Sequence, residues 1–154
     1  MAKTLHMETT QVSASRTAGE IIQELVSSGA RQIATDYNER QQITGLRWVF
    51  QVNGQPALFA MPARVEPIYK ILRSRRKGFQ GGAAELALRE QAERVAWRQL
   101  LRWVQAQIAL IQTGMVEPGE VFAPYLIDHG TGKTLWLQIT ESRFKALPPA
   151  GGAA

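Results

Sequence analysis

The sequence predicts an α+β fold, in which an antiparallel meander of three to five strands packs against one long central helix, with a short helix near the N-terminus. Three observations carry this prediction. Apolar residues recur with helical spacing near the N-terminus, two apolar segments flank Asn53-Gly54, and residues 84–113 contain neither proline nor glycine. At 154 residues, we expect a single domain over residues 1–146 and a disordered Pro/Gly/Ala tail over residues 147–154.

The first elements follow in order along the chain. Residues 3–12 alternate weakly between polar and apolar side chains, which favours a strand. Thr17 and Glu20 match a capping box, and Gly29 suits the position just past the end of the same helix. The residues that form one face of this helix are Ala18, Ile21, Ile22, Leu25 and Val26. Alternation at Ile33, Thr35 and Tyr37 predicts the next strand.

Residues 43–52 and 55–61 are predicted to form a β-hairpin around Asn53-Gly54, because a two-residue type I′ turn requires positive φ at both positions. This loop length fixes the register. The predicted opposite pairs are Val52 with Gln55, Phe50 with Ala57, Trp48 with Phe59, and Leu46 with Met61. These residues share an almost wholly apolar face, which we expect to be core, whereas the other face is mixed.

After the hairpin, residues 65–72 are predicted to form a short helix with Pro67 in its first turn. A basic, glycine-containing loop follows over residues 73–82. Residues 84–113 then form the long helix, whose wide apolar face indicates a central core element that also suits a subunit interface. Turns are expected at residues 117–120 and 128–132, and a final strand at residues 135–139.

Positive charge is concentrated in one quarter of the chain. Residues 64–102 hold ten Lys and Arg against four Glu, whereas the whole chain has a formal net charge of +5. A localised basic zone is typical of proteins that bind a polyanion. The chain has no cysteine, no apolar signal segment and no run long enough to cross a membrane, so we expect a cytoplasmic protein without a membrane partner.

Two parts of this zone are candidate nucleic-acid contacts. The loop residues expected to grip phosphates are Arg73, Arg75, Arg76 and Lys77, and Phe79 is available to stack on a base. A spacing of four residues places a second set on one face of the long helix, namely Arg94, Arg98 and Arg102. The alternatives are a solvated surface loop and an ordinary charged helix face.

The tryptophans divide by their surroundings. Trp48 and Trp103 lie on apolar faces and are expected in the core, Trp97 is expected to be partly exposed and able to stack on a base, and Trp136 is ambiguous. Gly130 to Thr134 resembles the end of a phosphate-binding P-loop. However, Ile127 stands where that motif requires glycine and a strand is expected to follow, so a simple turn is predicted.

No metal, cofactor or catalytic residue is expected. His6 and His129 are far apart in the chain, and the carboxylates show no ligand spacing. No pair of side chains has the pattern of a general acid and base.

Three stretches resemble a family of small uncharacterised proteins found in phage and mobile-element gene sets. They are residues 59–63, residues 92–98 and residues 121–125, and the similarity spans most of residues 8–140. The resemblance implies a genomic setting and no particular activity. At the level of fold, three antiparallel strands followed by a long helix resemble Rad52-like single-strand annealing proteins. The double-stranded-RNA-binding domain is a second analogy, but its basic cluster begins its second helix, so we prefer the first.

Together these observations predict a non-enzymatic protein that binds nucleic acid, specifically single-stranded DNA, as an annealing or recombination and replication accessory. We expect it to be a homo-oligomer. The alternative is an oligomeric adaptor or inhibitor whose basic zone binds an acidic protein surface, which does not require Phe79 or Trp97 to stack. A third alternative is a metal-dependent nuclease, which requires Asp36, Glu39 and Asp128 to converge around a metal ion.

Overall fold

The computed structural model describes residues 3–78 and 81–143, and its architecture is the predicted α+β arrangement. Phe79 and the predicted tail lie outside the described residues. The elements are α1 (Ala14–Ser27), β1 (Arg31–Tyr37), β2 (Ile43–Val52), β3 (Gln55–Pro62), α2 (Glu66–Ser74), α3 (Ala83–Gln112), α4 (Pro118–Phe122), η1 (Ala123–Tyr125) and α5 (Leu135–Glu141). The strands form one antiparallel sheet of order β1-β2-β3.

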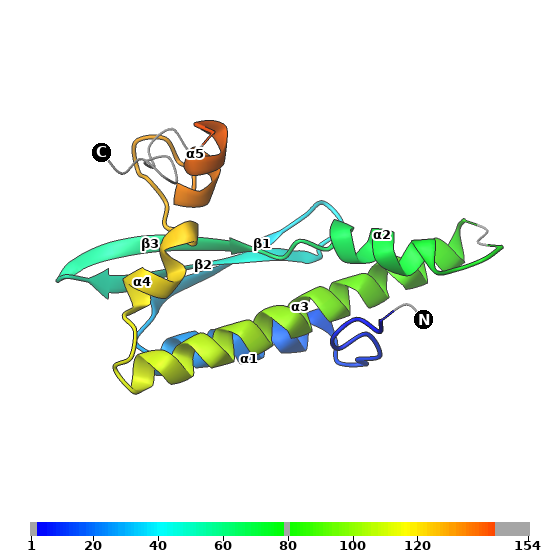
Figure 1. Cartoon of the computed structure of the whole chain (residues 1–154), viewed down its shortest axis with the longest axis horizontal. Coiled ribbons are helices and arrows are strands. Elements are labelled where there is room, and N and C mark those ends of the chain that lie inside the picture. The colour runs from blue at the N-terminus through cyan, green and yellow to red at the C-terminus, as the bar shows by residue number, and fades with distance from the viewer. Residues whose placement is uncertain (1–2, 79–80, 144–154) are drawn as a thin grey trace, which may run out of the picture.

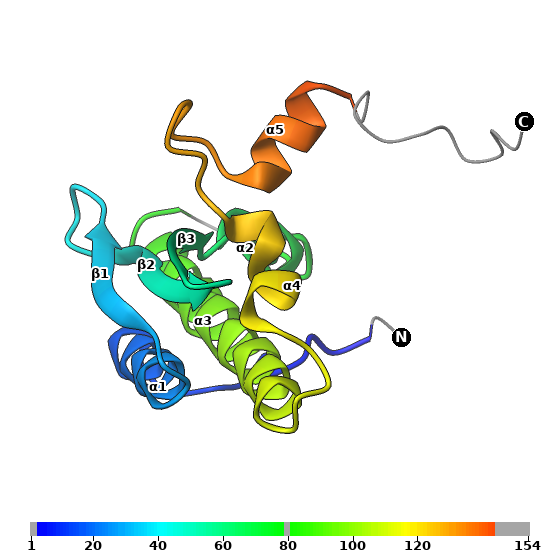
Figure 2. The same ribbon diagram turned by 90° about the vertical axis from the view of Figure 1, so that its left-hand side faces the viewer.

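The sheet lies between helices of very different size. The long helix α3 and the shorter α1 lie side by side under one face of the sheet, and α5 lies beyond the other face (Figures 1 and 2). Along α3, α2 lies near its beginning and α4 near its end (Figure 1). Among the described helices, none combines the length and the apolar character needed to cross a membrane.

The hairpin prediction is confirmed in both turn and register. Asn53 has a φ of 51° and Gly54 a φ of 77°, as a type I′ turn requires. All four predicted cross-strand pairs are present in the ladder between β2 and β3. The face that they share is turned toward the helices, because Leu46, Trp48 and Phe59 are fully buried.

An aromatic cluster occupies the centre of this core. The Phe122 ring, delivered by α4, lies 5.3 Å from Trp48, 5.8 Å from Phe50 and 5.6 Å from Trp103, measured between ring centroids. Phe59 stacks on Trp48 at 5.8 Å. These rings join β2, β3, α3 and α4, so the short helix α4 is fixed by the core although it has only five residues.

Two predicted strands are wrong. Residues 3–12 form no strand, and residues 6–9 are a turn, because the Glu8 carboxylate accepts a hydrogen bond from the backbone N–H of Leu5 at 2.6 Å and Met7 has a φ of 63°. Residues 135–139 belong to α5, because the Thr134 side chain caps a helix by accepting from the backbone N–H of Leu137 at 3.2 Å. Short apolar runs do not by themselves distinguish a strand from a helix.

Helix boundaries also differ from the predictions. Ser13, not Thr17, is the N-cap of α1, and its hydroxyl accepts from the backbone N–H of Arg16 at 3.2 Å. Thr17 lies one turn inside the helix and is fully buried. Within the basic zone, α2 continues to Ser74. It therefore includes Arg73, for which the sequence predicts a loop.

Two glycines are expected to respond to alanine with opposite signs. A Cβ at Gly45 meets the carbonyl oxygen of Met61 at 2.9 Å, so Gly45→Ala should lower the free energy of unfolding by about 1–3 kcal/mol. A Cβ at Gly19, inside α1, meets nothing within 4 Å, so Gly19→Ala should raise it by up to about 1 kcal/mol. Urea unfolding of both variants tests this. If both substitutions changed the free energy of unfolding in the same direction, the result would contradict the packing of Gly45 on β2 against Met61 on β3.

Candidate nucleic-acid interface

The basic zone is built on the antiparallel pair formed by α2 and the first turns of α3. Tyr69 and Leu72 of α2 are buried against Leu88 and Ala92 of α3. Leu5 of the N-terminal segment packs against the same small cluster. We call the end of the molecule where α2 and α3 meet the basic tip, and define it by Lys70, Arg73, Arg75, Arg76 and Lys77.

Arg89 forms ion pairs with two carboxylates that lie behind the basic tip. Its guanidinium lies 3.8 Å from the centroid of the Tyr69 ring, 3.2 Å from Glu66 and 3.4 Å from Glu85. The Tyr69 hydroxyl donates to Glu85 at 2.9 Å, and this hydrogen bond, with the charge of Arg89, holds the pKa of Glu85 below its usual range. Both carboxylates at the base of the tip are therefore ion-paired, and together with Arg89 they keep one formal negative charge.

Arg75 is paired with the N-terminal segment. Its Nη1 atom donates to both Glu8 oxygens, at 3.0 and 2.9 Å, and its Nη2 atom donates to the carbonyl of Lys3 at 2.7 Å. The pKa of Glu8 is lowered first by the backbone N–H of Leu5 and then by Arg75. This partner was not predicted, because 67 residues separate the two side chains.

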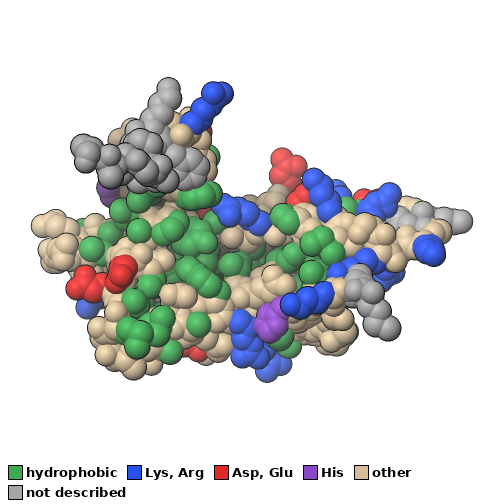
Figure 3. Space-filling view, viewed as in Figure 1, with side chains coloured by type: hydrophobic (Ala, Val, Ile, Leu, Met, Phe, Trp, Pro, Cys, Tyr) green, Lys and Arg blue, Asp and Glu red, His purple; other side chains and the backbone are tan. Residues whose placement is uncertain are grey.

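Other members of the basic tip face solvent. Lys70, Arg73, Arg76 and Lys77 are all exposed. Within the described part of the chain, no ion pair involves Lys70, Arg76 or Lys77. Figure 3 shows Lys and Arg side chains gathered around this end of the molecule. Phosphate groups can therefore reach Lys70, Arg76 and Lys77 without breaking an ion pair among the described residues.

The three arginines of the α3 stripe are engaged with neighbouring side chains. Arg94 donates to Gln91 at 2.6 Å and Arg102 to Gln105 at 3.2 Å. Arg98 reaches α1 and donates to Glu20 at 3.0 Å and to the buried Thr17 hydroxyl at 3.3 Å, and its side chain is only 15% exposed. Arg98 thus joins α3 to α1, whereas Arg94 and Arg102 bind neighbouring side chains of α3 itself.

The N-terminal segment also lies across α3 beside this stripe. The Gln91 amide donates to the carbonyl oxygens of Glu8 and Thr10, at 2.8 and 3.0 Å. The Gln99 amide donates to the carbonyl of His6 at 2.8 Å. These contacts place residues 6–10 along the α3 surface at Gln91 and Gln99, beside the arginine stripe.

The prediction that Trp97 is exposed enough to stack on a base is wrong. Trp97 is fully buried, and its Nε1 donates to the carbonyl of Ile43 at 3.3 Å. Trp48 is in the core, as predicted, whereas Trp103 is only half-buried. Trp136 on α5 is 43% exposed.

Most of the apolar face of α3 is buried against other elements of the same chain. Its fully buried members include Val95, Leu101 and Val104, while Leu100 and Trp103 remain half-buried. A subunit contact along the whole face, as the sequence suggested, therefore does not fit. The exposed apolar residues of α5 are Leu135, Trp136 and Leu137.

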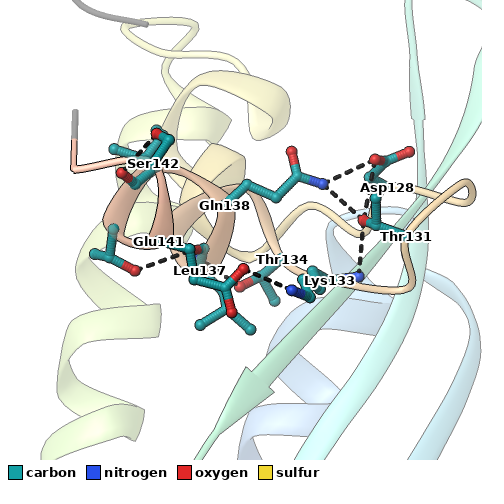
Figure 4. A network of polar contacts seen from close by, with 10 residues as sticks. Asp128, Thr131, Lys133, Thr134, Leu137, Gln138, Glu141 and Ser142 are labelled. Atoms are coloured by element: carbon teal, nitrogen blue, oxygen red, sulfur yellow. Dashed lines mark hydrogen bonds and ion pairs between the residues drawn. The ribbon is translucent and has the colours of Figure 1, made fainter. Parts of the chain in front are cut away.

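The turn that resembles a P-loop folds around its own carboxylate. Asp128 accepts hydrogen bonds from the backbone N–H of Gly130 at 2.9 Å, from Thr131 at 3.1 Å and from Gln138 at 2.8 Å (Figure 4). The hydrogen bond from Gly130 contributes most to lowering the pKa of Asp128. Because an anionic side chain takes these donors, the turn does not offer them to a phosphate.

The carboxylates named for a nuclease are not brought together. Asp36 is bound on the sheet by Arg47, with a shortest distance of 2.6 Å, and Asp128 is used in its own turn. In residues 3–78 and 81–143, no group of three or more His, Cys, Asp or Glu is close enough to hold a metal ion.

Comparisons of the chain with protein-family models, with curated proteins and with solved structures found no match. The function therefore has to be argued from the residues of the site and their surroundings.

Proposed function

We propose that this chain is a non-enzymatic nucleic-acid-binding protein whose basic tip contacts the phosphates of single-stranded DNA. In this proposal it acts in the cytoplasm, as a homo-oligomer, in strand annealing or as an accessory to recombination or replication. The observation that carries the proposal is the charge balance of the tip. Lys70, Arg76 and Lys77 are exposed and outside the ion pairs of the described chain, while the nearby Glu8, Glu66 and Glu85 are paired.

Physical chemistry supports a phosphate ligand at this tip. Each Lys or Arg that neutralises a phosphate releases condensed counterions, which drives binding at low salt. Lysine and arginine on a short turn between two helices can approach a flexible strand from several directions. Arg73 and Arg75 extend the same surface, and Arg75 exchanges Glu8 for a phosphate when the strand binds.

An adaptor that binds an acidic protein surface is the second candidate. It is favoured by the apolar run on α5, where Leu135, Trp136 and Leu137 are 36%, 43% and 43% exposed. Exposed apolar side chains in a row are typical of protein contact surfaces.

Fluorescence anisotropy with labelled single- and double-stranded oligonucleotides at two salt concentrations tests the proposal. We expect Arg76→Ser/Lys77→Ser to weaken binding about tenfold or more and to reduce the salt slope by about 0.7 for each phosphate that the variant no longer neutralises. The matched control is Arg16→Ser/Arg31→Ser, which removes the same charge from exposed residues of α1 and β1 and should change affinity about twofold at most.

Two results would contradict the proposal. One is the absence of salt-dependent binding by the wild-type protein at low salt. The other is an equal loss of affinity in the test and control variants, because net charge alone would then explain the binding.

A further inference from the structure

A groove of about 340 Å³ opens between the end of β3, α2, α3 and η1. Figure 3 shows hydrophobic side chains over the middle of the face that carries α3, with Lys and Arg side chains beside them. The groove is lined by Pro62, Arg64, Ile68, Ala96, Gln99, Leu100, Trp103 and Tyr125.

Two aromatic rings form part of the groove wall. Trp103 and Tyr125 lie 5.8 Å apart, centroid to centroid, at an interplanar angle of 75°. Trp103 is backed by the buried Phe122 ring at 5.6 Å, so its orientation is fixed by the core. Both rings are half-buried, and each therefore keeps part of its surface accessible from the groove.

The charge of the groove suits an anionic ligand. The described residues that line it include no Asp or Glu, and Arg64 is exposed at its rim. The charged residues that line a larger concavity of about 540 Å³, between the β1–β2 turn and α3, are Glu39, Glu66, Glu90, Glu93, Arg40 and Arg89. Burial, together with Glu90, raises the pKa of Glu93, as expected where negative charges are crowded. The concavity thus holds four Glu against two Arg, whereas the groove holds one Arg and no acidic residue, so the groove suits a polyanion better.

The groove is connected to the basic tip. The Gln99 side chain, in the wall of the groove, donates a hydrogen bond to the carbonyl of His6. Two residues further along the N-terminal segment, Glu8 accepts a hydrogen bond from Arg75 of the tip. Ile68 lies in the groove on α2, and Arg75 of the tip is the C-cap residue of the same helix, seven residues further along, with helical backbone angles, so both lie on nearly the same side of the helix. One strand can therefore contact both.

We infer that this groove holds an unpaired base of the bound strand, with Trp103 and Tyr125 as the stacking surfaces and Arg64 on the adjoining phosphate. The inference rests on the proposed function and adds the source of its preference for single strands. Bases of a duplex are stacked and paired inside the helix and do not reach such a groove, whereas every base of a single strand offers a π-face.

An abasic deoxyribose-phosphate oligomer is the decisive probe, because it has the charge of oligo(dT) of equal length but no bases. The wild-type protein should bind oligo(dT) about tenfold more tightly than the abasic oligomer. Tyr125→Leu should remove most of this preference while leaving the affinity for the abasic oligomer unchanged. The matched control is Tyr37→Leu, at a tyrosine that is 60% exposed on β1, and it should keep the preference.

Tryptophan fluorescence gives a second measurement that does not depend on Tyr125→Leu folding well. Oligo(dT), but not the abasic oligomer, should quench the wild-type emission. Trp103→Phe should abolish that quenching, whereas Trp136→Phe should retain it.

Each other outcome overturns the inference. Equal wild-type affinity for the two oligomers leaves the basic tip as a phosphate site and rejects the groove, whereas no binding of either rejects the proposed function itself. An equal loss of the preference in Tyr125→Leu and Tyr37→Leu also rejects the groove. If Tyr125→Leu breaks up an oligomer in size-exclusion chromatography and keeps the base preference, the groove is a contact between copies instead.

Discussion

Phe122→Ala is expected to lower the free energy of unfolding by about 3–5 kcal/mol, the usual range for removing a buried phenyl ring. Phe122 is fully buried and contacts rings from β2, β3 and α3. Because α4 has five residues and is too short to be stable alone, its position depends on tertiary packing, to which Phe122 contributes its only fully buried side chain among the described residues. The loss should therefore combine a cavity with the release of α4 and η1.

Urea unfolding followed by tryptophan emission measures this effect. Phe122→Leu keeps most of the apolar volume and should cost less than half as much as the alanine variant. Met115→Ala, at a side chain that is 71% exposed, is the control and should change the free energy of unfolding by no more than about 0.5 kcal/mol. A loss below about 1 kcal/mol for Phe122→Ala would contradict the central place given to this ring.

The hairpin was predictable because its determinants are local. Asn53-Gly54 fixes the turn, and the turn fixes which residues face one another, so the apolar pattern of β2 and β3 could be checked against it. The long helix α3 was predictable for a similar reason, since thirty residues without a helix breaker leave few alternatives.

Elements that depend on a single capping contact were not predictable. Leu135 to Ile139 suits either a strand or a helix, and the Thr134 hydroxyl decides for the helix. In the N-terminal segment the Glu8 carboxylate favours a turn over a strand, because it accepts hydrogen bonds from both the Leu5 N–H and Arg75. Local alternation of polar and apolar residues contains no information about such partners.

The candidate site also has one part that could be predicted from the sequence and one part that could not. Exposed basic residues at a helix end follow from composition, and Arg76 and Lys77 are exposed as expected. The groove does not follow from composition, because Arg64, Trp103 and Tyr125 come from three distant parts of the chain. The only available signal was the half-polar character of Trp and Tyr, which often lie where one side of the ring is accessible.

Arg98→Met is expected to lower the free energy of unfolding by about 2–3 kcal/mol, because it removes a charged donor from two partners on α1. Methionine replaces the aliphatic stem of arginine and removes its guanidinium, so the loss reports mainly on the hydrogen bonds and the ion pair. Arg102→Met, one turn further along at an exposed residue with a single partner, should change stability by no more than about 0.5 kcal/mol.

A double-mutant cycle assigns the Arg98 effect to its partner. In a Glu20→Gln background, the loss caused by Arg98→Met should shrink by about 1 kcal/mol or more, because the charged partner is already gone. The oligonucleotide affinity of Arg98→Met distinguishes a role of Arg98 in joining α1 to α3 from a role in binding phosphate. Unchanged affinity with reduced stability makes Arg98 the link between α1 and α3. A loss of affinity, measured well below the unfolding temperature, instead supports the phosphate contact that the four-residue spacing predicts for Arg94, Arg98 and Arg102.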